Sequence, residues 1–329
     1  GNDADPQNGE DFFTLRGNSF LGQPRATRDI QTVDPALTPE FTKELELGTD
    51  ISLFKRRVNA EFTWYDKTST NLIYPIDVPV TTGYTRFFTN LGEISNKGIE
   101  AALTVRPVVN KNFTWEVRGV FTKNKNIVEK LVDGLVRANL GSISYIEAGK
   151  PYGYLYGTAI ARTADGQMLI DAATGWPIED QVPRLIGDPN PDWKMGVTNN
   201  ISYKGFSISA VWDMTKGGDF YSETVTSLLG RGVTRDTEDR EKNRVIAGVY
   251  ANPANVYTPL LVGGKTVPNQ TRISTNDLFF STSTIAASFS INGHDEFNVY
   301  DGTVYRLREI TMGYDLPKNF VKKLKLTAI

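Results

Sequence analysis

The stretch KELELGTDISLFKRRVNAEFTWYDK, residues 43–67, decides the fold class of this protein. From Leu45 to Leu53 every second residue is apolar or threonine, and the residues between them are charged, small or polar. After a short, largely basic break at residues 54–57 the alternation restarts and runs from Val58 to Trp64. Alternation with a period of two is typical of a β-strand that has one apolar and one polar face. Two such segments around a short break predict a β-hairpin.

The same pattern recurs three times further along the chain. The second pair comprises residues 99–106 and 113–122 around a break at 107–112, and the third comprises residues 193–203 and 206–214 around Lys204 and Gly205. The last recurrence is a segment at 304–314, which is followed by a proline-containing turn at 315–323 and a new start at Leu324. Repeated hairpins with little helical periodicity predict an all-β, antiparallel fold.

Short and long connections alternate between these segments. The breaks within the pairs are short, whereas the stretches between pairs are long, namely Thr68 to Lys97, Lys123 to Asp192 and Lys216 to Thr303. Outer-membrane barrels combine short periplasmic turns with long extracellular loops. The connections therefore predict a transmembrane up-and-down β-barrel in which the short turns are periplasmic and the long loops extracellular.

This orientation makes a prediction about the aromatic residues, which collect at the two membrane interfaces of such barrels. Trp64, Trp193 and Trp212 lie near the ends of their strands that face the long connections. A second group lies beside the short breaks and consists of Phe113, Trp115, Tyr203 and Phe206. We expect these seven residues to form two girdles at the membrane interfaces.

The polar faces of the same segments are rich in charge, and they include Glu44, Glu46, Asp50, Glu61, Glu100 and Arg118. Such faces suit the wet or plugged lumen of a barrel, and they also suit the surface of a soluble β-protein. A secreted β-sandwich or adhesin-like binding module is therefore the alternative. The two interpretations differ in which face is curved inward and in whether the three tryptophans contact lipid or a core.

Composition narrows the possible functions. The chain has 329 residues, a net charge of -2 and no cysteine, and it contains no apolar run of the roughly 18 residues that a transmembrane helix requires. The slight negative charge argues against nucleic acid as a partner. Without cysteine, disulfides and thiolate chemistry are excluded.

In their amino-acid sequence, four stretches resemble the SusC/RagA family of TonB-dependent transporters. They are LTPEFTKELELGTDISLFKRRVNAEFTWYDKTSTNLIY at residues 37–74, NLGEISNKGIEAAL at 90–103, IGDPNPDWKMGVTNNISYKGFSISAVWD at 186–213 and VYRLREITMGYDLPKNFVKKL at 304–324. The second stretch, with its Asn-x-Gly-Glu-x-x-Asn-Lys-Gly-x-Glu pattern, is the most specific. The stretches occur in the order that the family has and cover most of the chain.

The resemblance implies a barrel of about 22 strands with a plug inside it. It further implies TonB-dependent uptake of an oligomeric nutrient, a glycan or an oligopeptide, with a SusD-like surface lipoprotein as a lid. Residues 1–329 resemble the C-terminal portion of the barrel. We expect the plug, the TonB box and the final barrel strands to lie outside this chain, and TonB to act through the missing N-terminal part.

Catalytic motifs are incomplete, so we expect no enzyme activity, cofactor or metal. His294 is the single histidine and is interpreted as a solvated loop residue, and residues 263–266 lack the first glycine of a phosphate-binding loop and are interpreted as a turn. Asp165 and Asp171 lack the spacing of a calcium loop. Glu44 and Glu46 share a strand face and would be the paired carboxylates of a glycosidase, but a polar lumen also explains them.

The long connections contain aromatic residues of the kind that stack on sugar rings or contact peptides. Tyr152, Tyr154, Tyr156 and Tyr221 are the candidate substrate-binding residues. The competing interpretation is that these tyrosines pack the loops against each other.

Overall fold

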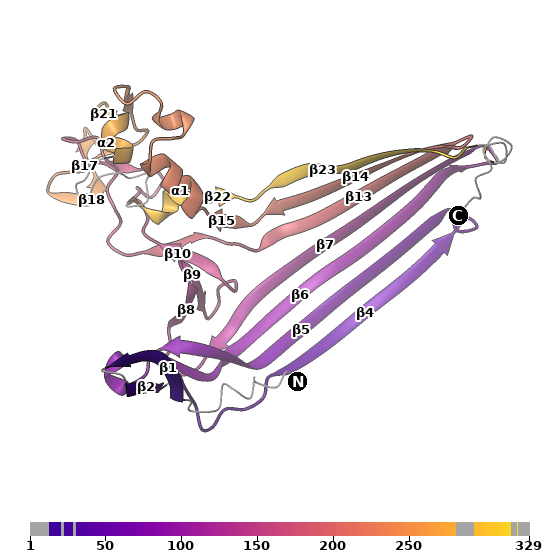
Figure 1. The fold of residues 1–329 in the computed structure, drawn as a ribbon. Coiled ribbons are helices and arrows are strands. Elements are labelled where there is room, and N and C mark those ends of the chain that lie inside the picture. The colour runs from indigo at the N-terminus through magenta and orange to yellow at the C-terminus, as the bar shows by residue number, and fades with distance from the viewer. Residues whose placement is uncertain (1–12, 21–22, 29–30, 281–292, 317–320, 322–329) are drawn as a thin grey trace.

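Seven long strands form one curved antiparallel sheet in the computed structural model, which describes residues 13–20, 23–28, 31–280, 293–316 and 321 (Figure 1). The strands are β4 (Phe41–Leu53), β5 (Val58–Asp77), β6 (Arg86–Val109), β7 (Phe113–Leu131), β13 (Pro191–Tyr203), β14 (Phe206–Gly217) and β23 (Val304–Tyr314). Each pairs antiparallel with the next, so the order is that of an up-and-down meander. The short strand β3 (Gln31–Val33) adds to β6 in parallel.

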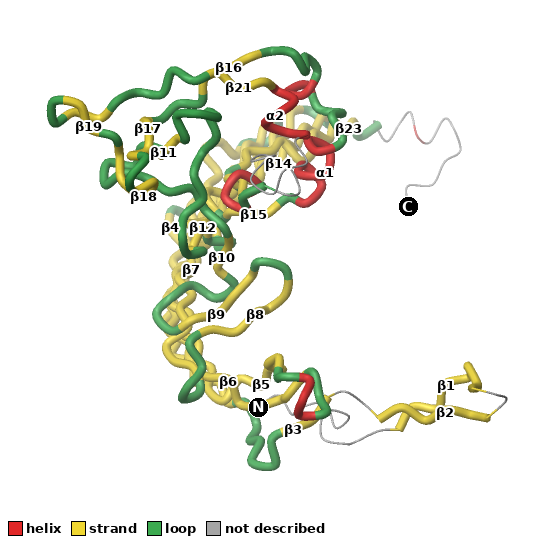
Figure 2. The backbone as a smooth tube through the Cα atoms, turned by 90° about the vertical axis from the view of Figure 1, so that its left-hand side faces the viewer, coloured by secondary structure: helices red, strands yellow, loops and turns green. Residues whose placement is uncertain are grey.

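The remaining elements form a layer of loops at one end of the sheet, with a separate hairpin of β1 (Phe13–Phe20) and β2 (Gln23–Arg28) (Figures 1 and 2). The strands of the layer are β8 (Arg137–Gly141), β9 (Ser144–Glu147), β10 (Tyr154–Gly157), β11 (Leu169–Ile170), β12 (Arg184–Gly187), β15 (Asp219–Tyr221), β16 (Asn243–Val245), β17 (Val249–Asn252), β18 (Asn255–Pro259), β19 (Leu261–Val262), β20 (Lys265–Thr266), β21 (Arg272–Ser274) and β22 (Val299–Asp301). Its helical elements are η2 (Val80–Thr82), α1 (Glu223–Gly230), η3 (Arg235–Thr237), α2 (Thr275–Phe280) and η4 (Asp295–Asn298).

The three predicted hairpins are confirmed, and the short turns close in different ways. Between β13 and β14 a two-residue turn uses Lys204 and Gly205 at positive φ, 46° and 91°. Between β6 and β7 the side chain of Asn110 accepts hydrogen bonds from the backbone N–H groups of Asn112 (3.0 Å) and Phe113 (2.9 Å). Local turn chemistry therefore fixes the register of each pair.

Two predicted boundaries are wrong, because backbone pairing continues where side-chain alternation stops. The predicted connection from Thr68 to Lys97 is mostly strand, and the observed connection is residues 78–85. The pairing passes Asn71, which adopts φ 57° at a register shift. Pro107 also lies within β6 and not in a break, since a second register shift between Val105 and Val108 accommodates a residue without an N–H.

The other two long connections also differ from the prediction of plain loops. β7 continues to Leu131, and the connections that follow it and β14 contain the small sheets and helices of the loop layer. The new strand expected from Leu324 lies outside the described residues. In the part of the chain that the structure describes, no helix has the length and apolarity needed to cross a bilayer.

The buried apolar residues lie in the loop layer and at the adjoining strand ends. Three clusters form around Val128 and Ile146, around Leu169 and Val249, and around Ile273 and Leu278. By contrast, apolar side chains along the main part of the sheet are exposed, for example Leu47 at 61%. The sheet therefore carries an apolar face that no part of the described chain covers.

Candidate functional site

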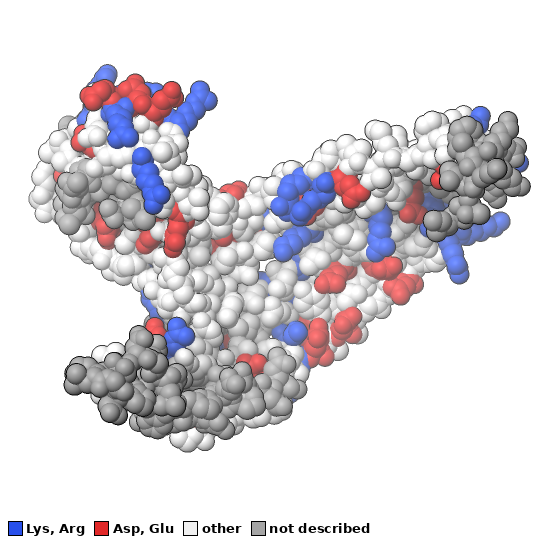
Figure 3. All heavy atoms as spheres, viewed as in Figure 1, with Lys and Arg blue, Asp and Glu red and all other residues white. Residues whose placement is uncertain are grey.

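The curved sheet has a concave and a convex face, and between the short turns and the level of Phe62 the charges lie on the concave one. Figures 1 and 2 show the curvature, and Figure 3 shows acidic and basic side chains across the hollow side of the sheet. The register places Glu44 opposite Lys67 and Glu61 opposite Ala102, all on this face. The prediction that charged and apolar residues separate onto two faces is confirmed.

The convex face carries an uncharged band that crosses all seven strands. One level of the register runs through Phe62, Ala101, Phe121, Met195, Met214 and Tyr305. From the level of Phe62 to the short turns, the outward positions of the seven strands include no Asp, Glu, Lys or Arg. The distance along β7 from Phe113 to Phe121 is eight residue steps of about 3.3 Å each. For a strand tilt of about 40°, this corresponds to a height of about 20 Å along the barrel axis. This height is close to that of the apolar band of an outer-membrane barrel.

The aromatic residues beside the short turns form a continuous row. Phe113, Tyr203, Phe206 and Tyr314 are consecutive partners across four strands. The ring centroids are 6.4 Å apart for the first two residues and 4.3 Å for the last two. Trp115 lies one level nearer the loop layer and donates its indole N–H to the side-chain oxygen of Asn199 at 2.8 Å. This hydrogen bond gives the amide oxygen a partner on an otherwise apolar face.

The three predicted outer tryptophans are on the convex face, but not at one level. Trp64 is opposite Ile99, and Trp193 packs against Phe121 with centroids 6.0 Å apart. Trp212 is opposite Val197, four residues further from the loop layer than Trp193. The register therefore brings Trp64 and Trp193 to the edge of the uncharged band and places Trp212 inside it.

Charges of opposite sign gather on different strands of the concave face. Carboxylates dominate β4 to β6, with Glu44, Glu46 and Glu100 around an open hollow that Lys67 also lines. Cations dominate the other side, where Arg306 and Arg308 both bind Asp213, at 2.7 and 3.1 Å. Glu44 and Glu46 thus line a wide polar surface.

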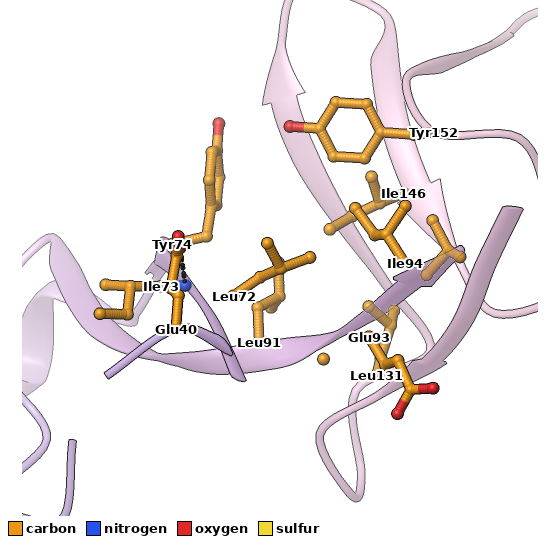
Figure 4. A pocket seen from close by; sticks show the side chains of 12 residues that line it. Glu40, Leu72, Ile73, Tyr74, Leu91, Glu93, Ile94, Leu131, Ile146 and Tyr152 are labelled. Carbon is orange, nitrogen blue, oxygen red and sulfur yellow. Dashed lines mark hydrogen bonds between the residues drawn. The ribbon is translucent and has the colours of Figure 1, made fainter. Parts of the chain in front are cut away.

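An apolar pocket of about 230 Å³ opens where the sheet meets the loop layer (Figure 4). Its wall is made by the outer ends of β5, β6 and β7 and by the β8–β9 hairpin, and it includes Leu72, Leu91, Ile94, Val128, Leu131, Ile146 and Tyr152. Glu40 also lines it and accepts a hydrogen bond from the N–H of Ile73 at 2.8 Å. Sequence reasoning did not predict this pocket, although the apolar run from Leu72 to Tyr74 at the end of the alternating pattern was a signal for it.

The four candidate tyrosines have different environments. Tyr152 lies beside the pocket and is 37% exposed, and burial raises its pKa. Tyr154 is 1% exposed, and its hydroxyl donates to Glu147 at 2.6 Å, so it packs the loop layer in this structure. Tyr156 lies under the guanidinium of Arg137, 3.9 Å from the ring centroid. Of these three, Tyr152 is the residue best placed to meet a solute.

Tyr221, the fourth tyrosine, belongs to a network that joins the two longest connections. Its hydroxyl donates to Asp295 at 3.4 Å, and burial and Asp295 both raise its pKa. Asp295 also accepts from the backbone N–H (2.9 Å) and hydroxyl (3.0 Å) of Thr158. Its neighbour Glu296 accepts from the N–H of Ile160 at 2.9 Å and forms an ion pair with Arg162. These contacts hold η4 against the β10 region.

The interpretation of His294 as a solvated residue is wrong. Its side chain is 8% exposed, and Nδ1 lies 3.3 Å from a carboxylate oxygen of Glu179. Burial lowers the pKa of His294, although Glu179, Glu296 and Asp295 act in the opposite direction. His294 is therefore a packed residue of the loop layer that precedes η4, and the sequence pattern of a polar loop did not reveal it.

The weak motifs of the sequence are turns. Gly263 and Gly264, at φ 59° and 76°, close the β19–β20 hairpin, which confirms the predicted turn. Asp171 accepts hydrogen bonds from the N–H groups of Ala173 and Thr174, both at 2.8 Å, as in an Asx turn. Within the described ranges no three His, Cys, Asp or Glu side chains gather as a possible metal site.

Comparison with known proteins identifies the fold. A family model described as "TonB dependent receptor-like, beta-barrel" matches residues 5–199. The chain belongs to the TonB-dependent receptor family. This family consists of outer-membrane transporters and not of enzymes, which agrees with the absence of a complete catalytic motif.

Relatives within the TonB-dependent receptors place the chain near SusC and RagA. TonB-dependent receptor P3 of Formosa agariphila is 28% identical over 316 residues, which cover 88% of this chain and 28% of that protein. TonB-dependent receptor SusC of Bacteroides thetaiotaomicron is 22% identical over 296 residues, which cover 84% of this chain and 26% of that protein. The solved structure of the RagAB peptide importer in the closed-closed state matches with a TM-score of 0.66 at 16% identity, over 95% of this chain and 33% of that chain. The chain thus spans about a quarter to a third of the length of these TonB-dependent receptors.

Proposed function

We propose that this chain forms part of the wall of a closed barrel, of about 22 strands, that takes up an oligomeric nutrient across the outer membrane. In this proposal the convex band contacts lipid and the concave face lines the passage. The short turns lie in the periplasm, and the loop layer lies outside the cell. Transport is driven through TonB, and the protein assembles with a SusD-like lipoprotein.

The observation that carries the proposal is the uncharged convex band. A charged side chain in the bilayer centre costs about 2–4 kcal/mol in a barrel, whereas a soluble protein has no reason to exclude charge from an exposed face. The band crosses seven strands and ends at Trp64 on one side and at the row of Phe113 and Tyr203 on the other. Its height and its aromatic borders support two girdles that include Trp64, Trp193, Phe113, Trp115, Tyr203 and Phe206, whereas Trp212 lies between them.

The loop layer and the pocket support a role in substrate contact. The pocket lies at the mouth of the concave face, where a nutrient would enter, and Tyr152 is accessible beside it. An apolar cavity with an exposed tyrosine is suited to the faces of sugar rings and to apolar side chains of peptides. RagAB is a peptide importer, which makes an oligopeptide one candidate substrate for this chain, and a glycan is the other.

The alternative of a secreted β-sandwich requires a second sheet over the apolar face. In the described part of the chain that face is uncovered, and Leu47, Ile310 and Met312 are 61%, 55% and 74% exposed. An exposed apolar surface of this extent destabilises a soluble protein but suits a lipid environment. The convex face therefore favours the transporter over the binding module.

Site-specific labelling tests the orientation, because residues 1–329 contain no cysteine and, once any cysteine elsewhere in the intact protein is replaced, each introduced thiol reports one position. The intact protein is expressed in its own outer membrane with Gly264→Cys in the β19–β20 hairpin or Lys111→Cys in a short turn. A membrane-impermeant maleimide should label Gly264→Cys on whole cells and label Lys111→Cys only after the outer membrane is opened. Equal labelling of both on whole cells would contradict the orientation. Loss of growth on one glycan or peptide source after deletion of the gene would then identify the nutrient.

A further inference from the structure

Three lysines meet on the convex face immediately beyond the uncharged band. Lys97 on β6 is directly opposite Lys125 on β7, and Lys123 is opposite Ile99 one level nearer the short turns. Alternation along both strands places all three on the same face as Trp64, which is opposite Ile99. The convex face thus changes within one level of the register from wholly uncharged to strongly basic.

The carboxylates near these lysines act on Lys97. Asp66 binds Lys97, with an N–O distance of 2.9 Å, and the charge of Glu129, which accepts a hydrogen bond from Ser95, attracts Lys97 as well. Lys123 and Lys125 are exposed and, within the described part of the chain, no carboxylate lies within ion-pair distance of either. Like charges directly opposite each other in an antiparallel pair destabilise the sheet. This arrangement therefore favours an anion that comes from outside the chain.

We propose that Lys123 and Lys125 bind a phosphate group of a glycolipid in the outer leaflet of the membrane. The inference rests on the proposed orientation, in which the loop layer is outside the cell. Lys123 and Lys125 supply ammonium groups on flexible stems at the height where a headgroup lies, and lysine binds phosphate as a point charge. Below them the uncharged band accepts the acyl chains. Trp64 and Trp193 border the band there, as aromatic rings do at a membrane interface.

Lipid retention by the intact protein tests the site. The double variant Lys123→Gln/Lys125→Gln and the control Lys111→Gln/Lys204→Gln, whose residues lie in the short turns, are extracted from the native outer membrane in mild detergent. The phosphorylated glycolipid that remains bound per protein is counted by native mass spectrometry. We expect at least a fivefold loss in the double variant and less than a twofold change in the control. Equal retention in the double variant and the unaltered protein would overturn the proposal.

Further measurements separate charge from folding and lipid from free phosphate. A charge-retaining variant, Lys123→Arg/Lys125→Arg, should keep the lipid, which guards against a loss caused by misfolding. Added glycolipid should rebind to delipidated protein, whereas the same glycolipid without its phosphates, or inorganic phosphate at millimolar concentration, should not raise its thermal stability. Equal binding of the dephosphorylated lipid would refute the phosphate site, and a response to inorganic phosphate alone would show an ion site and not a lipid site.

The failure of this site is distinguishable from failure of the proposed function. The lysines face away from the concave surface, so nutrient uptake by the double variant should remain unchanged while its lipid is lost. Loss of lipid in a protein that transports nothing would support the site and contradict the transporter. If the lipid lost were instead a phospholipid of the inner leaflet, the site would be periplasmic and the inference would be wrong.

Discussion

Ala101 and Ala102 on β6 offer a matched test of the two faces of the sheet. Ala101 lies on the convex face between Phe62 and Phe121, and Ala102 lies on the concave face between Glu61 and Val120. Replacement of either residue by arginine introduces the same side chain into the same strand, one position apart. Only the direction in which the charge points differs, so the comparison isolates the environment of each face.

The size of the effect follows from depth. Ala101 lies one level of the register, or two residues, inside the Trp64 level, which is about 6.6 Å along the strand and about 5 Å in height for a tilt of about 40°. This is a little less than halfway to the midplane of the roughly 25 Å that separate the Trp64 level from the row of Phe113 and Tyr203. Arginine at the midplane costs about 2–4 kcal/mol and near the interface about 0–1 kcal/mol. We therefore expect Ala101→Arg to cost about 1–2 kcal/mol.

Ala102→Arg should change the free energy of unfolding by less than about 0.5 kcal/mol, because its side chain would extend into a polar space beside the carboxylate of Glu61. Equilibrium chemical denaturation of the intact protein in lipid vesicles measures both variants. A larger loss of stability for Ala102→Arg than for Ala101→Arg would refute the assignment of the convex face to lipid. An equal loss for both would mean that neither face distinguishes lipid from water.

Two further predictions concern the loop layer. Tyr152→Ala should weaken nutrient binding by the intact protein several-fold in calorimetry, because it removes the exposed ring beside the pocket. Tyr154→Phe should leave the affinity unchanged and only lower stability, through loss of the hydrogen bond to Glu147. A stronger effect of Tyr154→Phe on affinity would disprove this assignment. Burial lowers the pKa of His294, so the opened segment binds a proton more tightly than the packed one, and packing should lose stability as the pH falls below about 6.5. Hydrogen-exchange protection of residues 293–298, corrected for intrinsic rates, should decrease as the pH is lowered from 7.5 to 5.5. The variant His294→Gln should abolish this pH dependence. If the variant kept the same pH dependence, the dependence would belong to another group.

The barrel wall was predictable because its chemistry repeats every two residues. Leu45 to Leu53 and Val58 to Trp64 alternate so strictly that hairpin, register and faces follow from the pattern, and the structure pairs Leu53 with Val58. The pattern depends on a membrane on one side and water on the other. Above the Trp64 level that contrast ends, which explains why the continuation of β5 to Asp77 was not predicted.

The loop layer was not predictable from local pattern, because its contacts join distant segments. Asp295 binds Thr158 across a separation of 137 residues, and nothing near either residue in the sequence indicates the pairing. For the same reason His294 was interpreted as solvated although it is buried beside Glu179. The pocket likewise combines Leu72 of β5 with Ile146 of β9.

The environment of each residue along one strand tests the central claim most directly. Single cysteines from Gly98 to Val105 on β6, each carrying a spin label in the intact protein in lipid vesicles, report collision rates with oxygen, which concentrates in lipid, and with a water-soluble nickel complex. The uncharged convex band predicts higher oxygen access at Ile99, Ala101, Leu103 and Val105, and higher nickel access at the residues between them. If the nickel complex reached all eight positions equally, or if the alternation had the opposite phase, the convex face would not contact lipid and the assignment of this sheet to a barrel wall would be wrong.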